Sequence, residues 1–297
     1  MNRDRTAKEP PTLSFVGAGR AAAALALAAR NAGYRIAAVY GRRRDRAVQV
    51  ADLTGARLTP TALAAATSAE ITIVAVPDGA IPGVAATLAA TGARLAGRAL
   101  VHTAARLGPE ALAAARLSAA QVGVIHPLQA LCGPESASLL DGSFFRVEAE
   151  GRLREQLDTL VAALGGHVLD VPPAARAVYH AAAVLAGNAP LALLARAEEV
   201  LQGAGVEPAA AHAALATLLH GAAANARRTH GAVALTGPVA RGDVGAIAAH
   251  VDALQPDPDV RALYVTLAME MARLAGRDAA SLGRDAEQPV SAMQRVA

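Results

Sequence analysis

The sequence predicts an α/β fold in which a doubly wound sheet is followed by an all-α C-terminal domain. Short apolar runs alternate with helical patterns from residue 12 to residue 172, and a glycine-rich turn follows the first run. Beyond residue 172 the pattern is helical throughout. Alternating strands and helices are typical of a parallel sheet that is covered by helices on both faces.

A β-α-β unit opens the patterned part of the chain. Residues 13–16 predict a buried strand, residues 21–31 predict a helix that ends before Gly33, and residues 35–40 predict the second strand. The unit is about 30 residues long, which is the length of a parallel crossover. Residues 1–11 are polar and end in proline, so we expect a disordered tail.

The alternation continues after the second strand. Apolar runs predict strands at 71–76, 99–102 and 121–125, with weaker candidates at 144–148 and 167–171. Helices are predicted between them at 47–54, 62–66, 81–88, 108–117 and 153–164. Runs that stay apolar, instead of alternating with polar residues, indicate strands that are buried on both faces.

The pattern changes at Pro172–Pro173, where we expect the domain boundary. The first domain then covers residues 12–172 and the second covers residues 173–276. The second carries helical patterns at 177–201, 208–230, 242–254 and 260–275. Residues 277–297 are predicted to be a polar tail.

Composition excludes several classes of protein. Aromatic residues make up only 2% of the chain, so the core must consist of Ala, Leu and Val, and stacking platforms for single-stranded nucleic acid are missing. Cys132 is the only cysteine, which rules out a disulfide framework and a cysteine-based zinc site. The net charge is only +3, and no uncharged apolar run of about 18 residues marks a membrane span. We expect no nucleic-acid partner, no membrane partner, no metal and a cytoplasmic location.

The stretch "GAGRAA" fits a dinucleotide-binding fingerprint. Gly17 makes the tight turn, Gly19 lets the backbone approach a pyrophosphate, and Ala22 lets helix and strand pack closely. The phosphates then lie at a helix N-terminus, where free N–H groups favour anions. The alternative is an ordinary strand–helix turn. The predicted cofactor contacts at this turn are Gly17, Ala18, Gly19, Arg20 and Ala21.

The end of the second strand indicates which dinucleotide is bound. An NAD site places an acidic residue there, whereas this chain reads "VYGRRRDR". Arginine forks bind phosphate bidentately, so Arg42, Arg43 and Arg44 predict NADP (NADPH) through its 2′-phosphate. The alternative is a solvated basic loop.

With these residues placed, the chain resembles Rossmann-like oxidoreductases that carry a C-terminal helical domain of unknown function (DUF2520-type). These are related to pyrroline-5-carboxylate reductase, ketopantoate reductase and the 6-phosphogluconate dehydrogenase group. The resemblance rests on "VGAGR", "VAVPDGAI", "VHTAA", "HPLQ", "YHAAAVLAGN" and "LTGPVARGD". It implies a Rossmann NADP-binding domain at 12–172 and a helical substrate and dimerisation domain at 173–276, with a homodimer formed through the latter. One departure is that Ala104 and Ala105 replace the family's usual Ser-Gly.

The strand ends supply further candidates. Ligands of open α/β sheets bind beyond the carboxyl ends of the strands. We therefore predict cofactor contacts from Val76, Pro77, Asp78, Ile81, His102 and Thr103, and substrate contacts from His126 and Gln129. Asp78 has an alternative as a helix N-cap, and each histidine has an alternative as a hydrogen-bonded structural residue.

The helical domain supplies the predicted chemistry. His180 suits a proton donor or acceptor for hydride transfer, and Asn188 suits a group that polarises the substrate. Arg241 is predicted to anchor a substrate carboxylate, with an Arg241–Asp243 clamp as the alternative. The remaining predicted substrate contacts are Asn225, Thr236 and Asp243.

The predicted reaction moves a hydride between nicotinamide and a small carboxylate-bearing C=O or C=N substrate that lies between the domains. An alternative is a non-catalytic NADP-binding protein with a redox-sensing or regulatory role.

Overall fold

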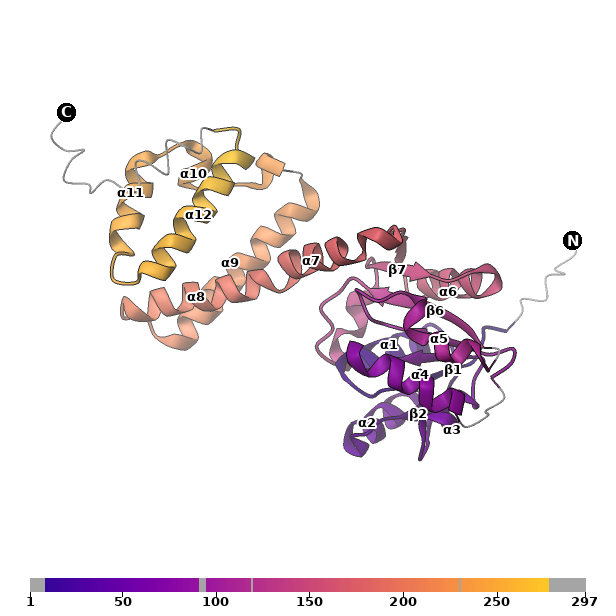
Figure 1. The fold of residues 1–297 in the computed structure, drawn as a ribbon. Coiled ribbons are helices and arrows are strands. Elements are labelled where there is room, and N and C mark those ends of the chain that lie inside the picture. Colours follow the sequence, from indigo (N-terminus) through magenta and orange to yellow (C-terminus); the bar gives the residue numbers. More distant parts are fainter. Residues whose placement is uncertain (1–8, 91–94, 119, 230, 278–297) are drawn as a thin grey trace, which may run out of the picture. The chain divides into compact units, whose positions relative to one another are not determined.

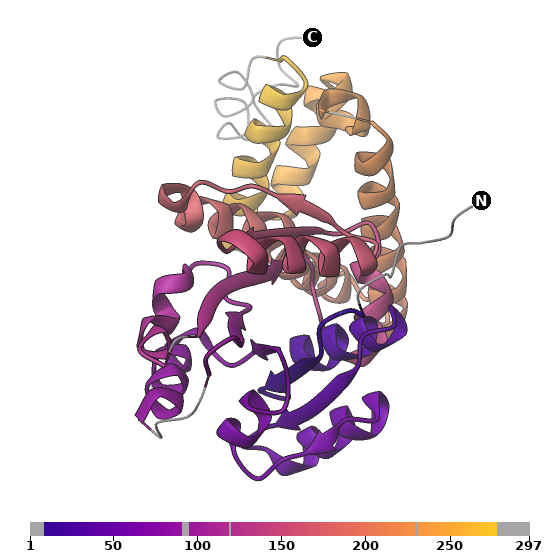
Figure 2. The ribbon, with the colours of Figure 1, turned by 90° about the vertical axis from the view of Figure 1, so that its right-hand side faces the viewer.

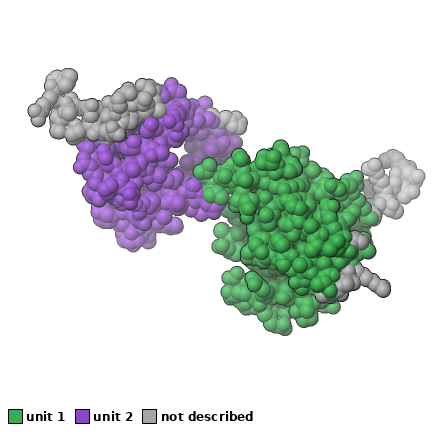
Figure 3. Space-filling model, viewed as in Figure 1, with its two compact units in different colours: residues 1–187 green, residues 188–297 purple. Residues whose placement is uncertain are grey.

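The computed structural model describes residues 9–90, 95–118, 120–229 and 231–277 (Figure 1). The predicted tails therefore lie mostly outside the described residues, as does His230 at the end of one predicted helix. The chain divides into two compact units, residues 1–187 and residues 188–297 (Figure 3). Each unit is described below by itself.

Unit 1 is built on one sheet of eight strands among the described residues, in the order β3-β2-β1-β4-β5-β6-β7-β8. The order reverses direction beside β1, which is the topological switch point of a doubly wound sheet. All neighbouring strands are parallel except β6 and β7. The strands, which Figure 2 shows from a second side, are β1 Leu13–Val16, β2 Ile36–Tyr40, β3 Arg57–Leu58, β4 Ile71–Val74, β5 Ala99–His102, β6 Gln121–Pro127, β7 Phe144–Glu148 and β8 His167–Leu169.

Helices cover both faces of this sheet. One buried cluster joins the sheet to α1 (Arg20–Asn31), α2 (Arg44–Thr54) and α6 (Gly151–Ala163). A second cluster joins it to α3 (Ala62–Ala66), α4 (Ile81–Ala90) and α5 (Ala113–Arg116). Short 3-10 turns complete the unit at Asp78–Ala80 (η1), Pro109–Leu112 (η2), Pro134–Leu140 (η3) and Pro173–Ala175 (η4). The predicted α/β class with a doubly wound sheet is confirmed.

Alanine lets these helices approach the sheet closely. Five of the six buried residues of α1 are alanines, at positions 22, 23, 24, 26 and 29. A methyl side chain keeps helix propensity high while adding little thickness between helix and sheet. This explains how a chain with so few aromatic residues fills its core.

Three element predictions needed correction. The short edge strand β3 escaped notice because two residues carry no periodic pattern. The helix predicted at 108–117 is a 3-10 turn followed by α5, because Pro109 and Glu110 tighten the first turn. The helix predicted at 177–201 is interrupted at Asn188, between α7 (Arg176–Gly187) and α8 (Ala189–Gly203).

Unit 2 is helical across its described residues. Its helices are α8, α9 (Pro208–Arg228), α10 (Pro238–Arg241), α11 (Val244–Ala253) and α12 (Pro258–Leu274), with a 3-10 turn η5 at Gly231–Ala234. Its buried apolar cluster is small and consists of Val239, Ile247, Ala268 and Ala272. The predicted all-α C-terminal domain is therefore present.

The helical stretch Pro173–Gly203 is apolar and exposed. Its mean hydropathy reaches 1.5, and none of the residues in that apolar window is buried. By length and composition alone it is able to cross a membrane, and among the described residues no other helix meets that criterion. The same criterion is met by helices that pack against protein surface, so it does not assign this stretch to a membrane.

The contacts divide the chain after α7, whereas the sequence placed a domain boundary at Pro172–Pro173. The sheet does end with β8 just before the two prolines. Helix α7 groups with unit 1 because Arg176 in its first turn is bonded to Glu110 and Glu148 of the sheet domain.

Candidate active site

The turn between β1 and α1 leaves room for a phosphate. Gly17 has a φ of +109°, and a Cβ there would lie 2.1 Å from the carbonyl oxygen of Ala75, so only glycine fits. Gly19 caps α1, and a Cβ built on it meets no atom within 4 Å. The first turn of α1 has no acidic residue and no side-chain cap among the described residues. Its N–H groups are therefore available to an anion.

Gly41 supports this turn, and the sequence analysis did not single it out. A Cβ on Gly41 would lie 2.9 Å from the Cβ of Ala18, so the end of β2 can pass the turn only as glycine. The signal was visible in the sequence as a glycine directly after the second strand. Ala18 and Gly41 thus bring the end of β2 against the predicted phosphate site.

The basic cluster after β2 is exposed, as expected for a cofactor contact. Arg43 is paired with Asp45 at 2.7 Å, and both side chains are more than half exposed. Arg42 and Arg44 have no ion pair or hydrogen bond to the rest of the described chain. Two guanidinium groups therefore remain available near the end of β2, where a 2′-phosphate would lie.

The end of β4 leads into η1 through Val76 and Pro77. Ile81 is fully buried and fixes the start of α4 in the second core cluster. The carboxylate of Asp78 makes no capping bond within the described chain. Its negative charge acts on His102 and His126, so it faces the strand ends.

His102 is a hydrogen-bonded histidine at the end of β5. Its Nδ1 accepts from the N–H of Ala104 at 3.1 Å, so Nε2 carries the proton and donates to the carbonyl of Gly108 at 2.9 Å. Burial lowers the pKa of His102. Both ring nitrogens are used within the chain, which favours the structural alternative over a direct cofactor contact.

The turn at Ala104–Ala105 is held without the hydroxyl that the resemblance leads one to expect. Both alanines are buried. The N–H of Ala104 is bonded to His102, and its carbonyl accepts from Nη2 of Arg146 at 3.0 Å. Backbone contacts thus replace any bond from a serine at this position.

His126, at the end of β6, is neutral with its proton on Nδ1. That proton is donated to the carbonyl of Thr103 at 2.9 Å, because a carbonyl oxygen only accepts. Burial lowers its pKa to about 4. At neutral pH the free Nε2 therefore carries a lone pair and accepts hydrogen bonds. The ring of Tyr179 lies edge-on to His126, with centroids 5.8 Å apart.

Arg146, directly opposite His126 on the antiparallel strand β7, is almost fully buried. Its Nη1 binds Glu148 at 2.7 Å, and its Nη2 donates to the carbonyls of Ala104 and Leu107. Its Nε makes no hydrogen bond. Arg146 was not among the predicted site residues, because a charged residue on a weak strand candidate looks solvent-exposed. The unusual signal was a lone arginine within "SFFRVEAE".

Helix α7 is fastened to the sheet by charged residues. Arg176 donates through Nη1 to Glu110 at 2.7 Å and through Nε to Glu148 at 3.1 Å. Glu148 therefore binds both Arg146 and Arg176. This network fixes the turn of α7 that carries Tyr179 and His180. The charge of His180 acts on His126, so the two predicted site residues do lie near each other.

Gln129 does not face this cluster of strand-end side chains. Its Nε2 donates to the carbonyl of Leu139 and to Oγ of Ser143, both at 3.1 Å. Its Oε1 accepts from the N–H of Ala130. Gln129 thus holds the loop between β6 and β7, and its substrate role stays a prediction.

The remaining predicted site residues belong to unit 2. Asn188 precedes α8, and Asn225 accepts from Arg228 at 2.7 Å within α9. Thr236 and Arg241 are exposed at either end of the short segment that includes α10. Asp243 caps α11 by accepting from the N–H of Ala246 at 3.0 Å, and the described contacts contain no Arg241–Asp243 ion pair. The predicted clamp between Arg241 and Asp243 is therefore absent.

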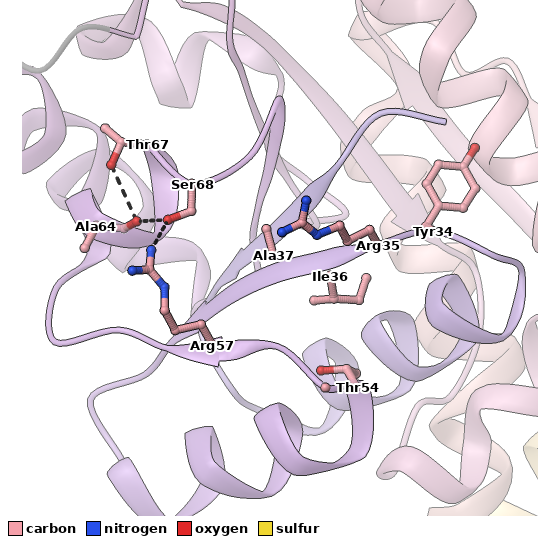
Figure 4. Close-up of a pocket in the computed structure, with 10 residues that line it drawn as sticks. Tyr34, Arg35, Ile36, Ala37, Thr54, Arg57, Ala64, Thr67 and Ser68 are labelled. Atoms are coloured by element: carbon pink, nitrogen blue, oxygen red, sulfur yellow. Dashed lines mark hydrogen bonds between the residues drawn. The ribbon is translucent and has the colours of Figure 1, made fainter. Parts of the chain in front are cut away.

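A cavity of about 640 Å³ lies at the opposite end of β2 from the arginine cluster (Figure 4). It is lined by Arg35, Arg57 and Thr54, and Arg57 donates to Ser68 at 2.8 Å. No predicted site residue lines it. Within the described residues, no group of three or more His, Cys, Asp or Glu side chains is arranged to hold a metal.

Comparison with known proteins places each part of the chain. Residues 12–106 match the family NADP oxidoreductase coenzyme F420-dependent, and residues 143–271 match DUF2520, a domain of unknown function. No curated protein matches the chain.

Solved structures match nearly the whole chain. A protein from Bacteroides fragilis that carries a provisional NADP oxidoreductase assignment is 24% identical, with a TM-score of 0.71 over 89% of this chain and 99% of its own. A protein from Thermotoga maritima is 24% identical, with a TM-score of 0.68 over 89% and 98%. An imine reductase from Pseudomonas sp. is 21% identical, with a TM-score of 0.62 over 93% and 99%. These likenesses establish the fold.

The two domain matches lie in the order that the sequence predicted. The structure has the same order: the glycine turn at Gly17–Gly19, with its uncapped helix N-terminus, lies in the first match, and most of the helical unit lies in the second. The chain therefore carries a domain of the NADP oxidoreductase family, residues 12–106, followed by a DUF2520 domain, residues 143–271.

Proposed function

We propose that this NADP-dependent oxidoreductase transfers a hydride between the nicotinamide and a small carboxylate-bearing substrate with a C=O or C=N bond. The proposal depends on one observation, which is that several candidate ligand-binding features lie together at the carboxyl ends of the strands. The uncapped start of α1, with open space beside Gly19, and the free arginines after β2 lie at the same edge as a cluster of buried polar side chains. Open α/β sheets bind their ligands at this edge.

The residues present fit an NADP molecule. Gly17, Ala18 and Gly19 would hold the pyrophosphate through backbone N–H groups, and Arg42 and Arg44 would hold the 2′-phosphate. Bound NADPH supplies the hydride. The protein's own residues position the substrate and handle the proton.

The proposed roles of the polar residues follow from their hydrogen bonds. His126 is neutral near pH 7 and offers only the lone pair of Nε2, so it is not the proton donor. His180 is the proposed proton donor, since its Nδ1 is buried without a partner. Asn188 and Arg241 of unit 2 remain the proposed polarising group and carboxylate anchor.

Assembly and location are part of the proposal. We propose a homodimer formed through the predicted helical domain, residues 173–276, supported by exposed apolar residues such as Leu185 in α7 and Leu191 in α8. The single cysteine is compatible with a reducing cytoplasm.

Calorimetry and a substrate screen test the proposal. We expect purified protein to bind NADPH more tightly than NADH, and to oxidise NADPH when supplied with 2-oxo acids or cyclic imines. His180→Ala should lower turnover by about 10²-fold or more while NADPH affinity is kept. His167→Ala, an exposed histidine on β8, is the control. Equal loss of turnover and NADPH affinity in His180→Ala would contradict its role, and NADPH binding without turnover would favour a regulatory protein.

The arginine cluster is tested by cofactor preference. Replacing Arg42 and Arg44 by Ala should weaken NADPH binding by about 10- to 100-fold, because each charge-assisted bond to phosphate is lost. NADH binding should stay unchanged. Arg35→Ala, just before the opposite end of β2, is the matched control. If the double variant weakens both cofactors equally, the arginines do not read the 2′-phosphate.

A further inference from the structure

Three buried polar atoms in unit 1 have no hydrogen-bond partner in the described structure. They are Nε of Arg146, the hydroxyl of Tyr179 and Nδ1 of His180. A buried donor without a partner costs about 1–3 kcal/mol, so such atoms are rare and need an explanation. All three belong to side chains at one edge of the sheet, which indicates that a ligand completes their bonding.

Strand register and ring packing bring these side chains together. Arg146 on β7 lies directly opposite His126 on β6. Residues in such a pair point to the same face of a sheet and have their Cβ atoms about 5 Å apart. Tyr179 of α7 packs edge-on against His126, and its hydroxyl interacts electrostatically with Arg146. Arg146 and Tyr179 are therefore neighbours across His126.

The hydrogen bonds already made limit what this cluster has to offer a ligand. His126 uses its only proton on Thr103, and His102 uses both of its nitrogens. The two Nη atoms of Arg146 are bound to Glu148 and to backbone carbonyls. The second hydrogen of Nη1 aside, Nε of Arg146 and the hydroxyl oxygen of Tyr179 are the two donor atoms that make no hydrogen bond.

These two donor atoms select the acceptor. A carbonyl oxygen has two lone pairs and satisfies both donors at once. A neutral imine nitrogen has only one lone pair. A protonated imine has none, and its positive charge is repelled by the buried guanidinium of Arg146. The donor set therefore favours a C=O bond over a C=N bond.

Resting on the proposed function, we infer that the hydroxyl of Tyr179 and the Nε–H of Arg146 bind the carbonyl oxygen of the substrate, so the enzyme reduces a 2-oxo acid or a similar ketone to an alcohol. In that step the carbonyl carbon gains a hydride and the C=O π electron pair moves to oxygen. The oxygen then takes one proton, and NADP⁺ is released. Donors placed on the oxygen stabilise the negative charge that develops there.

The titration of Tyr179 is compatible with this role. Burial raises its pKa to about 12, and the positive charge of Arg146 acts in the opposite direction. Among the described residues, the charged or titratable groups recorded against Tyr179 are Arg146, which acts on its hydroxyl, and His126, which contacts its ring. The hydroxyl therefore keeps its proton throughout the neutral range and remains a donor.

The variant Tyr179→Phe tests the inference, with Tyr34→Phe as the matched control. Tyr34 is a buried tyrosine of the same unit, in the first core cluster. We expect Tyr179→Phe to reduce the single-turnover rate of NADPH oxidation by about 10²- to 10³-fold. NADPH affinity should be unchanged. The thermal midpoint should stay equal or rise, because an unpartnered buried hydroxyl has been removed.

A lowered thermal midpoint for Tyr179→Phe would show that the hydroxyl serves packing, and would overturn the inference. An unchanged single-turnover rate would overturn it too. The thermal midpoint and the NADPH affinity are both measured without substrate. Neither value therefore depends on whether the variant has lost activity.

Substrate class is the second arm. Wild-type protein with NADPH should reduce pyruvate or glyoxylate at least tenfold faster than 1-pyrroline-2-carboxylate. Faster reduction of the imine, or NADPH binding with reduction of neither class, overturns the carbonyl assignment while the proposed NADP site stands. If wild-type protein fails to bind NADPH at all, it is the proposed function that fails.

Discussion

The two glycines of the first turn do different work. Gly17 is required by the fold, because its φ of +109° and the carbonyl oxygen of Ala75 leave no room for a side chain. Gly19 has an ordinary φ of −78°, and a Cβ there meets nothing within 4 Å. The fold therefore does not require glycine at position 19, where a side chain would point into open space.

This contrast predicts opposite phenotypes. Gly17→Ala should lower stability by about 3 kcal/mol or more, because strain and a backbone clash combine. Gly19→Ala should cost at most about 1 kcal/mol, as a change of N-cap residue, yet should weaken NADPH binding by tenfold or more. Urea unfolding and calorimetry on both variants measure the two effects. Full NADPH affinity in Gly19→Ala would place the phosphates elsewhere.

His126 predicts how stability depends on pH. Its pKa is about 4 in the folded protein, below the ordinary value of 6.5. Between these values the unfolded chain binds a proton that the folded chain does not, so stability is complete above pH 6.5 and falls as pH drops toward 4. The loss attributable to His126 is on the order of 3 kcal/mol.

Urea unfolding at pH 7.5 and pH 5 measures this slope. His126→Asn should flatten it, because the Asn amide still donates to Thr103 but does not titrate. His167→Asn should keep the wild-type slope. An unchanged slope in His126→Asn would assign the pH dependence to other groups, of which His102 is the nearest, since burial lowers its pKa as well.

For single residues, the sequence predicts a role when that role depends only on neighbours along the chain. Gly17 and Gly19 stand in a fixed spacing next to a strand, so their function is visible in the printed letters. Arg146 is not visible in this way, because its burial depends on the register between two strands and on a helix that follows much later. Tyr179 is the first residue of the motif "YHAAAVLAGN", and nothing in its local sequence indicates an unpartnered hydroxyl.

Among the elements, β7 and α7 are joined by a carboxylate that two arginines share. Glu148 binds Arg146, which is 1% exposed, and Arg176, which is 16% exposed. Removing a shared carboxylate leaves a buried positive charge without compensation. Glu148 therefore holds α7 to the sheet and keeps Arg146 neutralised at the same time.

Glu148→Gln should accordingly destabilise the protein by about 2–4 kcal/mol, a figure reduced because Glu148 is itself partly exposed. Asp158→Asn, which breaks the more exposed pair between Arg154 and Asp158, should cost about 1 kcal/mol or less. Chemical denaturation compares the two. Similar small losses would mean that the Glu148 network is as weak as a surface pair.

The bounds of strands and helices were predicted correctly where the sequence carries one clear apolar pattern. The strands β1 and β5 and the helix α3 have the predicted bounds, because each is a short and mostly apolar run. Edge strand β3 and the interruption at Asn188 were missed. A two-residue strand exists only through its partner β2. The break at Asn188 did have a local signal, because Pro190 stands in the first turn of α8 and proline favours a helix start over a helix interior.

For the whole molecule, the exposed apolar helices require a covering surface. No residue of α7 or α8 is buried, and Val178 and Leu185 are each 71% exposed. Burying such side chains yields about 25 cal/mol per Å² of apolar area, so an uncovered face of this kind favours association. The fold class was predictable from alternation alone, but what these exposed faces contact is not encoded in any local pattern.

A homodimer is therefore expected, with a solution mass of twice the 29.9 kDa chain. Light scattering coupled to gel filtration measures it. Leu185→Glu and Leu191→Glu should each shift the mass toward the monomer, because a carboxylate would be desolvated at the interface. Leu117→Glu, at an 88% exposed position of unit 1, should not. A monomeric wild type would leave the covering surface to another partner.

The antiparallel pairing of β6 with β7 makes activity a reporter of correct folding. Side chains alternate along a strand, so a slip of one residue would turn Phe145 or Val147 toward His126 and drive the guanidinium of Arg146 into the apolar layer. Such a misassembled molecule would still contain an intact nucleotide-binding half. A preparation that binds cofactor at full stoichiometry yet turns over slowly would thus point to a kinetic trap in assembly of the sheet, and not to damaged chemistry.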